Sequence, residues 1–235
     1  MTEHSSTEKA AGTTSSSGGI PVRFFPLGGG HLIVGTQLPI ELRNAVRFEA
    51  LWSLRAANTP SCREGRSKEP MPYCRQAFGV PENRQGNGPK QPSIPTCLHP
   101  LVDWCRAFSE TDFNGVAVEC QAVPSDYEAE PLRVNVRRLV PGSPIVTVSF
   151  GAPAMVRIVP FRRQSRCRAL DVRIDDGELL IMPGHTNADF SRKIESVDPS
   201  DGRRISVTLM SLVASDVEPG LRNILKHLPS LTQDC

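Results

Sequence analysis

The chain has 235 residues, of which 39% are hydrophobic, and its formal net charge at pH 7 is +2. A chain of this length can bury one substantial core, so we expect a single domain over residues 20–235. The near balance of charge excludes a global field that would attract a polyanion, which leaves local clusters of charge as candidate binding features.

The first 19 residues, MTEHSSTEKAAGTTSSSGG, contain neither the apolar core of a secretory signal nor the arginines of a mitochondrial presequence. Their composition predicts a disordered tail. No apolar run approaches the roughly 18 residues that a membrane span needs, so we expect an intracellular protein, cytoplasmic or nuclear, without a membrane partner. The seven cysteines include no C-x-x-C pair, which favours reduced thiols and no disulfide-linked partner.

The first predicted elements are a hairpin and a helix. The apolar runs VRFFPL and HLIVG flank the turn GGG, which is typical of a hairpin. A helix is expected to begin near Pro39 and to present one broad apolar face. From residue 55 to residue 95 the sequence is rich in Pro, Gly, Ser, Asn and Arg, which predicts a long surface loop.

A second helix follows this loop, because apolar residues recur there at the spacing of one buried stripe. The stripe consists of Leu98, Leu101, Val102, Cys105 and Phe108. After Asn114 the hydrophobic period changes to two, and the turn DDGE suggests a tight hairpin. The predicted strands are GVAVECQAV, PIVTVSFG, AMVRIVP, RALDVRI, ELLIMP and RRISVTLMSLV.

The segment VEPGLRNILKHL predicts a short closing helix. Two helices followed by mostly antiparallel strands indicate an α+β, mainly β fold. We expect a β-sandwich or jelly roll with two N-terminal helices packed on one face.

Four segments resemble the AlkB-like family of iron(II) and 2-oxoglutarate dependent dioxygenases, and the members that repair alkylated DNA are nearest. They are DFNGVAVECQ, PGSPIVTVSFGA, DGELLIMPGHTNADFSRKI and GRRISVTLM, in the order of the family. The resemblance implies a double-stranded β-helix core. It also implies an active site in which a His-x-Asp pair and a distal His hold iron on one face.

The residues that the resemblance assigns to iron are missing from this sequence. No histidine lies between His99 and His185, and the segment 131–135, where the His-x-Asp pair belongs, contains no carboxylate. The pattern of the third ligand reads FSRKI here, with Arg192 in the place of histidine. A guanidinium stays protonated and has no lone pair to offer a metal. We therefore expect no metal ligands at this site.

The residues that the resemblance assigns to 2-oxoglutarate are also changed. One face of the last strand begins with Arg204 and ends with Met210, where the family carries a second arginine. Glu119 and Gln121 replace an expected Asn and Tyr, and a glutamate repels a dicarboxylate unless it is protonated. We expect Glu119 to pair with Arg204 in this vestigial pocket, and two exposed strand-end charges are the alternative.

An arginine cluster remains as a candidate binding feature. The segment VRIVPFRRQSRCR resembles the basic loop with which duplex-repair members grip the strand opposite the damage. The predicted phosphate-binding residues are Arg133, Arg137, Arg138, Arg157, Arg162, Arg163, Arg166 and Arg168. A solvated hairpin and a protein interface are the alternatives. Stacking on a flipped base is not expected, because the long loop offers only Tyr73 and Phe78 before VPENRQGNG.

Two other clusters are less specific. The acidic residues of DDGE and Asp171 fit a turn better than a cation site. The cysteines that border the long loop would bind a metal only if the fold gathered them, namely Cys62, Cys74 and Cys97.

These features predict a catalytically inactive AlkB-like protein, a pseudoenzyme without iron or 2-oxoglutarate. It would act as an interaction or scaffold module on nucleic acid or in a ribonucleoprotein assembly. One alternative is an active demethylase of alkylated DNA or RNA whose iron and 2-oxoglutarate are held outside the family pattern, for example by His185 with His99 or His227. Another is a subunit that binds only protein.

Overall fold

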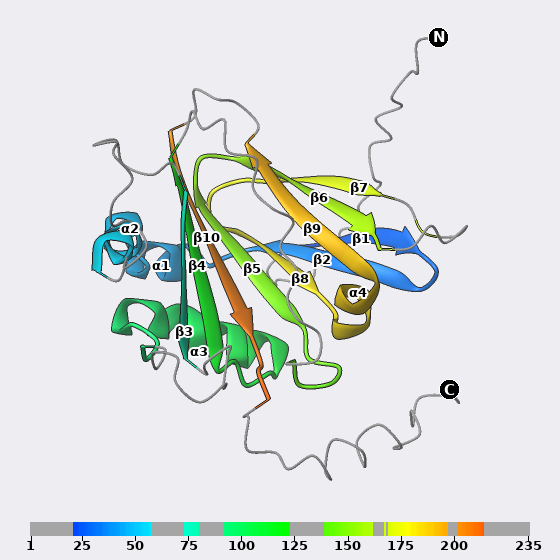
Figure 1. Ribbon diagram of the computed structural model, residues 1–235, viewed down its shortest axis with the longest axis horizontal. Coiled ribbons are helices and arrows are strands. Elements are labelled where there is room, and N and C mark those ends of the chain that lie inside the picture. Colours follow the sequence, from blue (N-terminus) through cyan, green and yellow to red (C-terminus); the bar gives the residue numbers. More distant parts are fainter. Residues whose placement is uncertain are drawn as a thin grey trace, which may run out of the picture.

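Figure 1 shows a computed structural model of the chain, which describes residues 21–57, 73–79, 92–122, 139–161, 167, 169–196 and 202–213. An antiparallel sheet of seven strands packs against a smaller antiparallel sheet of three strands. Helices cover the other face of the larger sheet (Figure 1). The predicted fold class, mainly β with helices on one face, is therefore confirmed.

The predicted hairpin is formed by β1 (Val22–Gly28) and β2 (His31–Gln37), which pair antiparallel. Three consecutive glycines make its turn, and all three have a positive φ. Residues with a Cβ rarely adopt this backbone region, so the GGG sequence sets the position of the turn.

The predicted first helix is two helices, α1 (Ile40–Ala45) and α2 (Phe48–Ala57). The backbone leaves the helical region at Val46, with φ −91° and ψ 84°, and the side chain of Val46 is buried in the core. Tertiary packing of this branched side chain interrupts a pattern that reads as one continuous helix.

The second predicted helix is α3 (His99–Ser109), preceded by the 3-10 turn η1 (Thr96–Leu98). The stripe is buried as predicted except at its end. Phe108 is exposed, and its ring stacks on Trp104 with the ring centroids 4.9 Å apart. The prediction that Phe108 is a core residue is thus wrong, because the stripe has rotated out of the core by the last turn of the helix.

The prediction of an uninterrupted loop from residue 55 to residue 95 is also wrong. Within it lies β3 (Tyr73–Gly79), which pairs with β4 (Gly115–Ala122) and forms an edge of the larger sheet. Phe78 is buried against the helices and is therefore not available to stack on a base. Gly79 ends the strand with φ +92°, and a Cβ there would lie 2.1 Å from the carbonyl oxygen of Asn114.

All six predicted strands after Asn114 are present, and a seventh strand, β9, was missed. Their bounds are β4 as above, β5 (Ile145–Gly151), β6 (Ala154–Pro160), β7 (Leu170–Ile174), β8 (Glu178–Met182), β9 (Phe190–Ser196) and β10 (Arg203–Met210). The short helix α4 (Gly184–Asp189) precedes β9. The strand orders are β1-β2-β8-β5-β10-β4-β3 and β7-β6-β9.

The turn DDGE is a turn but not a hairpin. It connects β7 of the smaller sheet to β8 of the larger sheet, and the two strands do not pair with each other. The sequence predicts a change of direction at Gly177, whose φ is +78°, but it does not reveal the change of sheet. The predicted closing helix at residues 217–228 lies outside the described residues.

Strand alternation divides the interior into two layers. Val146, Val148 and Phe150 of β5 face the helices, and Ile205, Val207 and Leu209 of β10 do the same. The opposite face of the larger sheet carries apolar residues where β2 and β8 meet the smaller sheet. Along β4, β5 and β10 this inner face carries both a small apolar cluster and a group of polar residues, and the polar residues form the candidate site.

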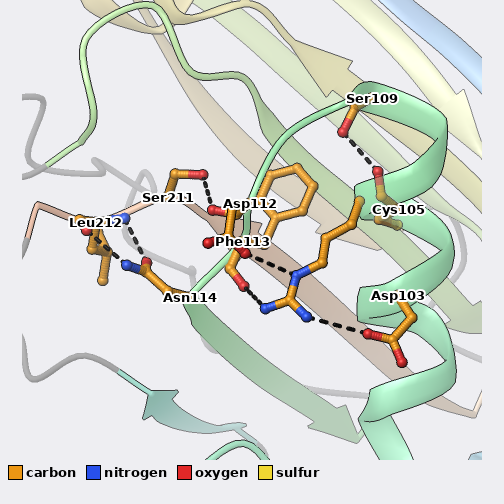
Figure 2. A network of polar contacts seen from close by, with 9 residues as sticks. Asp103, Cys105, Ser109, Asp112, Phe113, Asn114, Ser211 and Leu212 are labelled. Atoms are coloured by element: carbon orange, nitrogen blue, oxygen red, sulfur yellow. Dashed lines mark hydrogen bonds and ion pairs between the residues drawn. The ribbon is translucent and has the colours of Figure 1, made fainter.

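Polar contacts fix the loop between α3 and β4, and Figure 2 shows the residues around this loop. Arg106 donates a hydrogen bond of 2.9 Å to the carbonyl of Phe113, and its side chain also contacts Asp103 and Asp112. Asn114 exchanges two hydrogen bonds with the backbone of Leu212. These contacts fix the start of β4 to the end of β10.

No helix of the described residues is long and apolar enough to cross a membrane.

Candidate functional site

The inner face of the larger sheet carries a row of buried hydroxyl groups. Thr147 and Ser149 of β5 lie opposite Thr208 and Ser206 of β10 in the strand register. Their apolar neighbours in sequence point to the helices, so the polar residues must point to the smaller sheet. The alternation in IVTVSFG and RRISVTLM is the sequence signal for this row, which we predicted only for the strand RRISVTLM.

Arg192 reaches this row from the opposite sheet. It lies on β9 opposite Ile158 of β6, among apolar side chains, and is only 5% exposed. Its Nη1 donates a hydrogen bond of 2.7 Å to Thr147 Oγ1, and its Nη2 lies 3.4 Å from Thr208 Oγ1. The residue that replaces the expected histidine ligand therefore bridges the two sheets.

Arg204 is a second buried guanidinium on the same face. It is 4% exposed, and its Nε and Nη2 each lie 3.4 Å from Ser149 Oγ. Burial lowers the pKa of both Arg192 and Arg204 to about 10, because the charged form loses its hydration. Both guanidinium groups therefore remain protonated at neutral pH.

Glu119 supplies negative charge to this site. It lies on β4 opposite Ser206, is 8% exposed, and favours the charged forms of Arg192 and Arg204 by electrostatic attraction. Its Oε1 lies 3.3 Å from Nε of Arg75 on β3. Glu119 and Arg204 are both buried and electrostatically coupled, so the alternative of two exposed strand-end charges is wrong. Arg75 was not predicted as part of this site, because its segment was predicted to be a loop.

The two remaining residues of the predicted vestigial pocket lie at its margins. Gln121 is half-buried and lies opposite Arg204 in the strand register. Met210 is buried at the other end of β10, in a small apolar cluster with Ala117, Ile145 and Leu212. Met210 therefore belongs to the core.

The residues around Arg192 do not fit an iron centre. Within the described ranges, no group of three or more His, Cys, Asp or Glu side chains is arranged to hold a metal ion. The segment 131–135, where the first two ligands were expected, lies outside these ranges. His185 is exposed in α4 with its ring 5.5 Å from that of His31, whereas His99 begins α3 in the helical layer. His227 also lies outside the described residues.

These residues do not fit 2-oxoglutarate either. The cavity beside Arg192 is lined by Thr147 and by apolar side chains of both sheets, and its volume is about 10 Å³. That is room for about one water molecule. The side chain of Arg192 itself occupies the space between the sheets, and the carboxylate of Glu119 would repel a dicarboxylate.

The structure places one residue of the predicted arginine patch. Arg157 is exposed on the outer face of β6, and its Nε lies 3.4 Å from Asp171 on β7. Lys193 lies opposite Arg157 on β9, and Arg173 is exposed on β7; neither was predicted. The other predicted residues lie outside the described ranges, namely Arg133, Arg137, Arg138, Arg162, Arg163, Arg166 and Arg168.

The acidic residues near the β7–β8 turn have structural partners. Asp176 pairs with Arg43 and accepts a hydrogen bond from the backbone of Gly151. Glu178 pairs with Arg23 at 2.7 Å. These contacts support the interpretation as a turn. Cys74 and Cys97 lie in separate elements, β3 and η1, and Cys62 lies outside the described residues.

Comparisons with known proteins bear on the fold. No protein-family model matches this sequence, and no curated protein matches it. The structure is similar to the solved structure of OsALKBH1, with a TM-score of 0.49 and 14% sequence identity. The similarity covers 81% of this chain and all of that chain. At this identity and TM-score the likeness carries no conclusion about activity or ligands.

Proposed function

We propose that this protein is a catalytically inactive AlkB-like protein that serves as an interaction or scaffold module on nucleic acid or in a ribonucleoprotein assembly. The observation that carries the proposal is the buried guanidinium of Arg192, which bridges the sheets through Thr147 and Thr208. A cation in this position repels a divalent metal and occupies the space that a ligand would need.

The charges around Arg192 support the same conclusion. Two buried arginines already need Glu119 as a counter-charge, and this carboxylate is held by Arg75 from the neighbouring strand. A network of buried, mutually compensated charges is costly to disrupt. The site is therefore suited to hold the two sheets together, and we assign it no step in a reaction.

The arginine cluster is the feature that supports nucleic acid as the partner. Arg157, Arg173 and Lys193 are on the outer face of the smaller sheet, which is continuous in sequence with the segment FRRQSRCR. Contacts between arginine and phosphate release counterions, so binding through this surface should weaken steeply with salt.

The first test measures whether the inner site still takes cofactors. The protein is heated under anaerobic conditions with manganese, as a redox-inert substitute for iron(II), with and without 2-oxoglutarate. Tight binding to the folded state must raise the melting temperature by mass action. We expect no shift. A shift that requires both additions would refute the proposal and would favour the active dioxygenase.

The second test measures nucleic-acid binding as a function of salt. We expect that changing Arg162, Arg163 and Arg166 to Ala reduces the slope of log affinity against log salt by about 2 to 3, since each phosphate contact contributes about 0.7 to 0.9. Arg47→Ala, an exposed arginine of the helical layer, is the control and should leave the slope unchanged. Absence of binding at low salt would favour a partner that is protein alone.

A further inference from the structure

We infer that Cys74 and Cys120 form an oxidisable thiol pair, which closes as a disulfide between β3 and β4 when the protein meets a peroxide or a small disulfide. This inference goes beyond the proposed function and does not depend on it. Both residues are thiols in the structure, and both are buried on the face of the larger sheet that the helices cover.

The strand register places the two thiols for this reaction. Cys74 lies directly opposite Cys120 in the antiparallel ladder between β3 and β4. Opposite residues in such a ladder have Cα atoms about 4.5 or 5.5 Å apart and Cβ atoms about 4.5 to 5.5 Å apart. A disulfide accepts Cα separations of about 4.4 to 6.8 Å and Cβ separations of about 3.5 to 4.5 Å. A small approach of the side chains is therefore enough to close the bond.

Other thiols of the described chain are less suited to react. Burial raises the pKa of Cys105 on α3 to about 12, and it also raises the pKa of Cys97 in η1. The thiolate is the nucleophile, so burial slows attack by every buried thiol, and what distinguishes Cys74 and Cys120 is their opposite position in the β3–β4 ladder. Cys167 lies near Gly28, in the hairpin region of the fold, and its Sγ is 3.9 Å from the carbonyl oxygen of Gly28.

The position of β3 gives an oxidant a route to the pair. Among the described strands, β3 is the last of the larger sheet and forms a ladder with β4 on one side. Cys74 is the second residue of that strand. Strand ends at a sheet edge open locally at a lower free energy than central strands, which exposes their buried side chains for short periods.

The reaction balances with either oxidant. With a peroxide, one thiolate attacks an oxygen and gives a sulfenic acid and water; the second thiol then attacks this sulfur, forms the S–S bond and releases a second water. With a small disulfide such as oxidised glutathione, two exchange steps form the protein disulfide and release two molecules of the reduced thiol. The two sulfur atoms of the protein are oxidised, and the peroxide or the small disulfide is reduced.

Formation of the disulfide would affect the candidate site through the neighbouring residue pair in the ladder between β3 and β4. Arg75 and Glu119 are the adjacent opposite residues, and their side chains form the ion pair on the other face of the sheet. A disulfide between Cys74 and Cys120 would hold this part of β3 against β4. It would thereby also fix the position of Glu119, the counter-charge of the buried arginines. Oxidation should therefore stabilise the edge of the sheet next to the site.

The test uses the full chain with its native cysteines. The reduced protein is incubated with oxidised glutathione or hydrogen peroxide, remaining thiols are alkylated, and peptides are mapped by mass spectrometry without reduction. We expect the peptide that links Cys74 to Cys120 as the main crosslink, a rise in melting temperature, and reversal of both by dithiothreitol.

Two controls separate this inference from non-specific oxidation. Cys105→Ser should leave the crosslink unchanged, whereas Cys74→Ser should abolish it and leave Cys120 to be alkylated. Peptide mapping of the native chain decides the question even if a variant fails to fold. A main crosslink between Cys74 and Cys105, or full alkylation of Cys74 and Cys120 after treatment, would overturn the inference.

Discussion

Replacing Glu119 with glutamine should destabilise the fold strongly, because it removes the counter-charge of two buried arginines and keeps the shape of the side chain. Arg192 and Arg204 are at most 5% exposed, and the electrostatic attraction of Glu119 favours the charged form of each. Removal of one partner from a buried ion pair costs about 3 to 5 kcal/mol, since a buried charge loses its compensation.

The change in melting temperature follows from the size of the chain. At about 2 to 4 °C per kcal/mol for 150 to 250 residues, Glu119→Gln should lower the melting temperature by roughly 6 to 20 °C. Urea unfolding near pH 7, with circular dichroism as the signal, measures the free energy directly. Glu49→Gln is the matched control, because Glu49 is an exposed carboxylate that pairs with Arg203 at the surface, and it should change stability little.

A double variant tests whether the loss arises from the arginines. Arg192→Met removes one of the two charges, so Glu119→Gln combined with Arg192→Met should lose less stability than the sum of the single changes. Additive losses would show that Glu119 acts independently of Arg192. A loss below about 1 kcal/mol for Glu119→Gln alone would refute the view that a compensated charge network holds the sheets together.

Four further outcomes are expected. At pH 7, Arg192→Met should be less stable than the native chain, because Glu119 loses one of its two buried counter-charges and Thr147 loses its hydrogen-bond donor. This deficit should grow between urea unfolding curves near pH 8 and near pH 11, because the folded pKa of Arg192 is about 10, below the usual value of 12.5, and rising pH removes this proton from the folded state first; a deficit that does not change with pH would contradict the lowered pKa. Arg192→His should give no manganese-dependent rise in melting temperature, because no partner ligands are gathered around it in the described chain; a clear rise would show ligands outside this part. Leu101→Ala should cost about 2 to 5 kcal/mol in thermal unfolding, because Leu101 is fully buried, whereas Phe108→Ala should cost much less, and equal losses would contradict the rotation of the α3 stripe. Gly79→Ala should speed hydrogen exchange in β3, because the new Cβ would collide with the carbonyl oxygen of Asn114. Unchanged exchange rates would argue against this close approach of Gly79 to Asn114.

Patterns of local hydrophobicity predicted most of the fold. The GGG turn, the buried stripe of α3 and the alternation in β4, β5 and β10 each depend on residues close in sequence. β3 and β9 were not predicted as strands, because YCRQAFG and FSRKIES contain too many polar residues to suggest a buried strand. Backbone hydrogen bonds from neighbouring strands hold both segments in place, and local propensity cannot report such contacts.

The sequence by itself determined which residue types stand where the resemblance expects metal ligands, since this statement needs only residue types and their order. The family resemblance, and not the sequence pattern alone, implied that Arg204 and Glu119 lie on neighbouring strands of one sheet. Only the tertiary structure decided that Arg192 crosses from β9 to Thr147, and that Arg75 approaches Glu119 from an unpredicted strand. The physical reason is that contacts between sheets, and the burial that lowers the pKa of an arginine, depend on residues far apart in the chain.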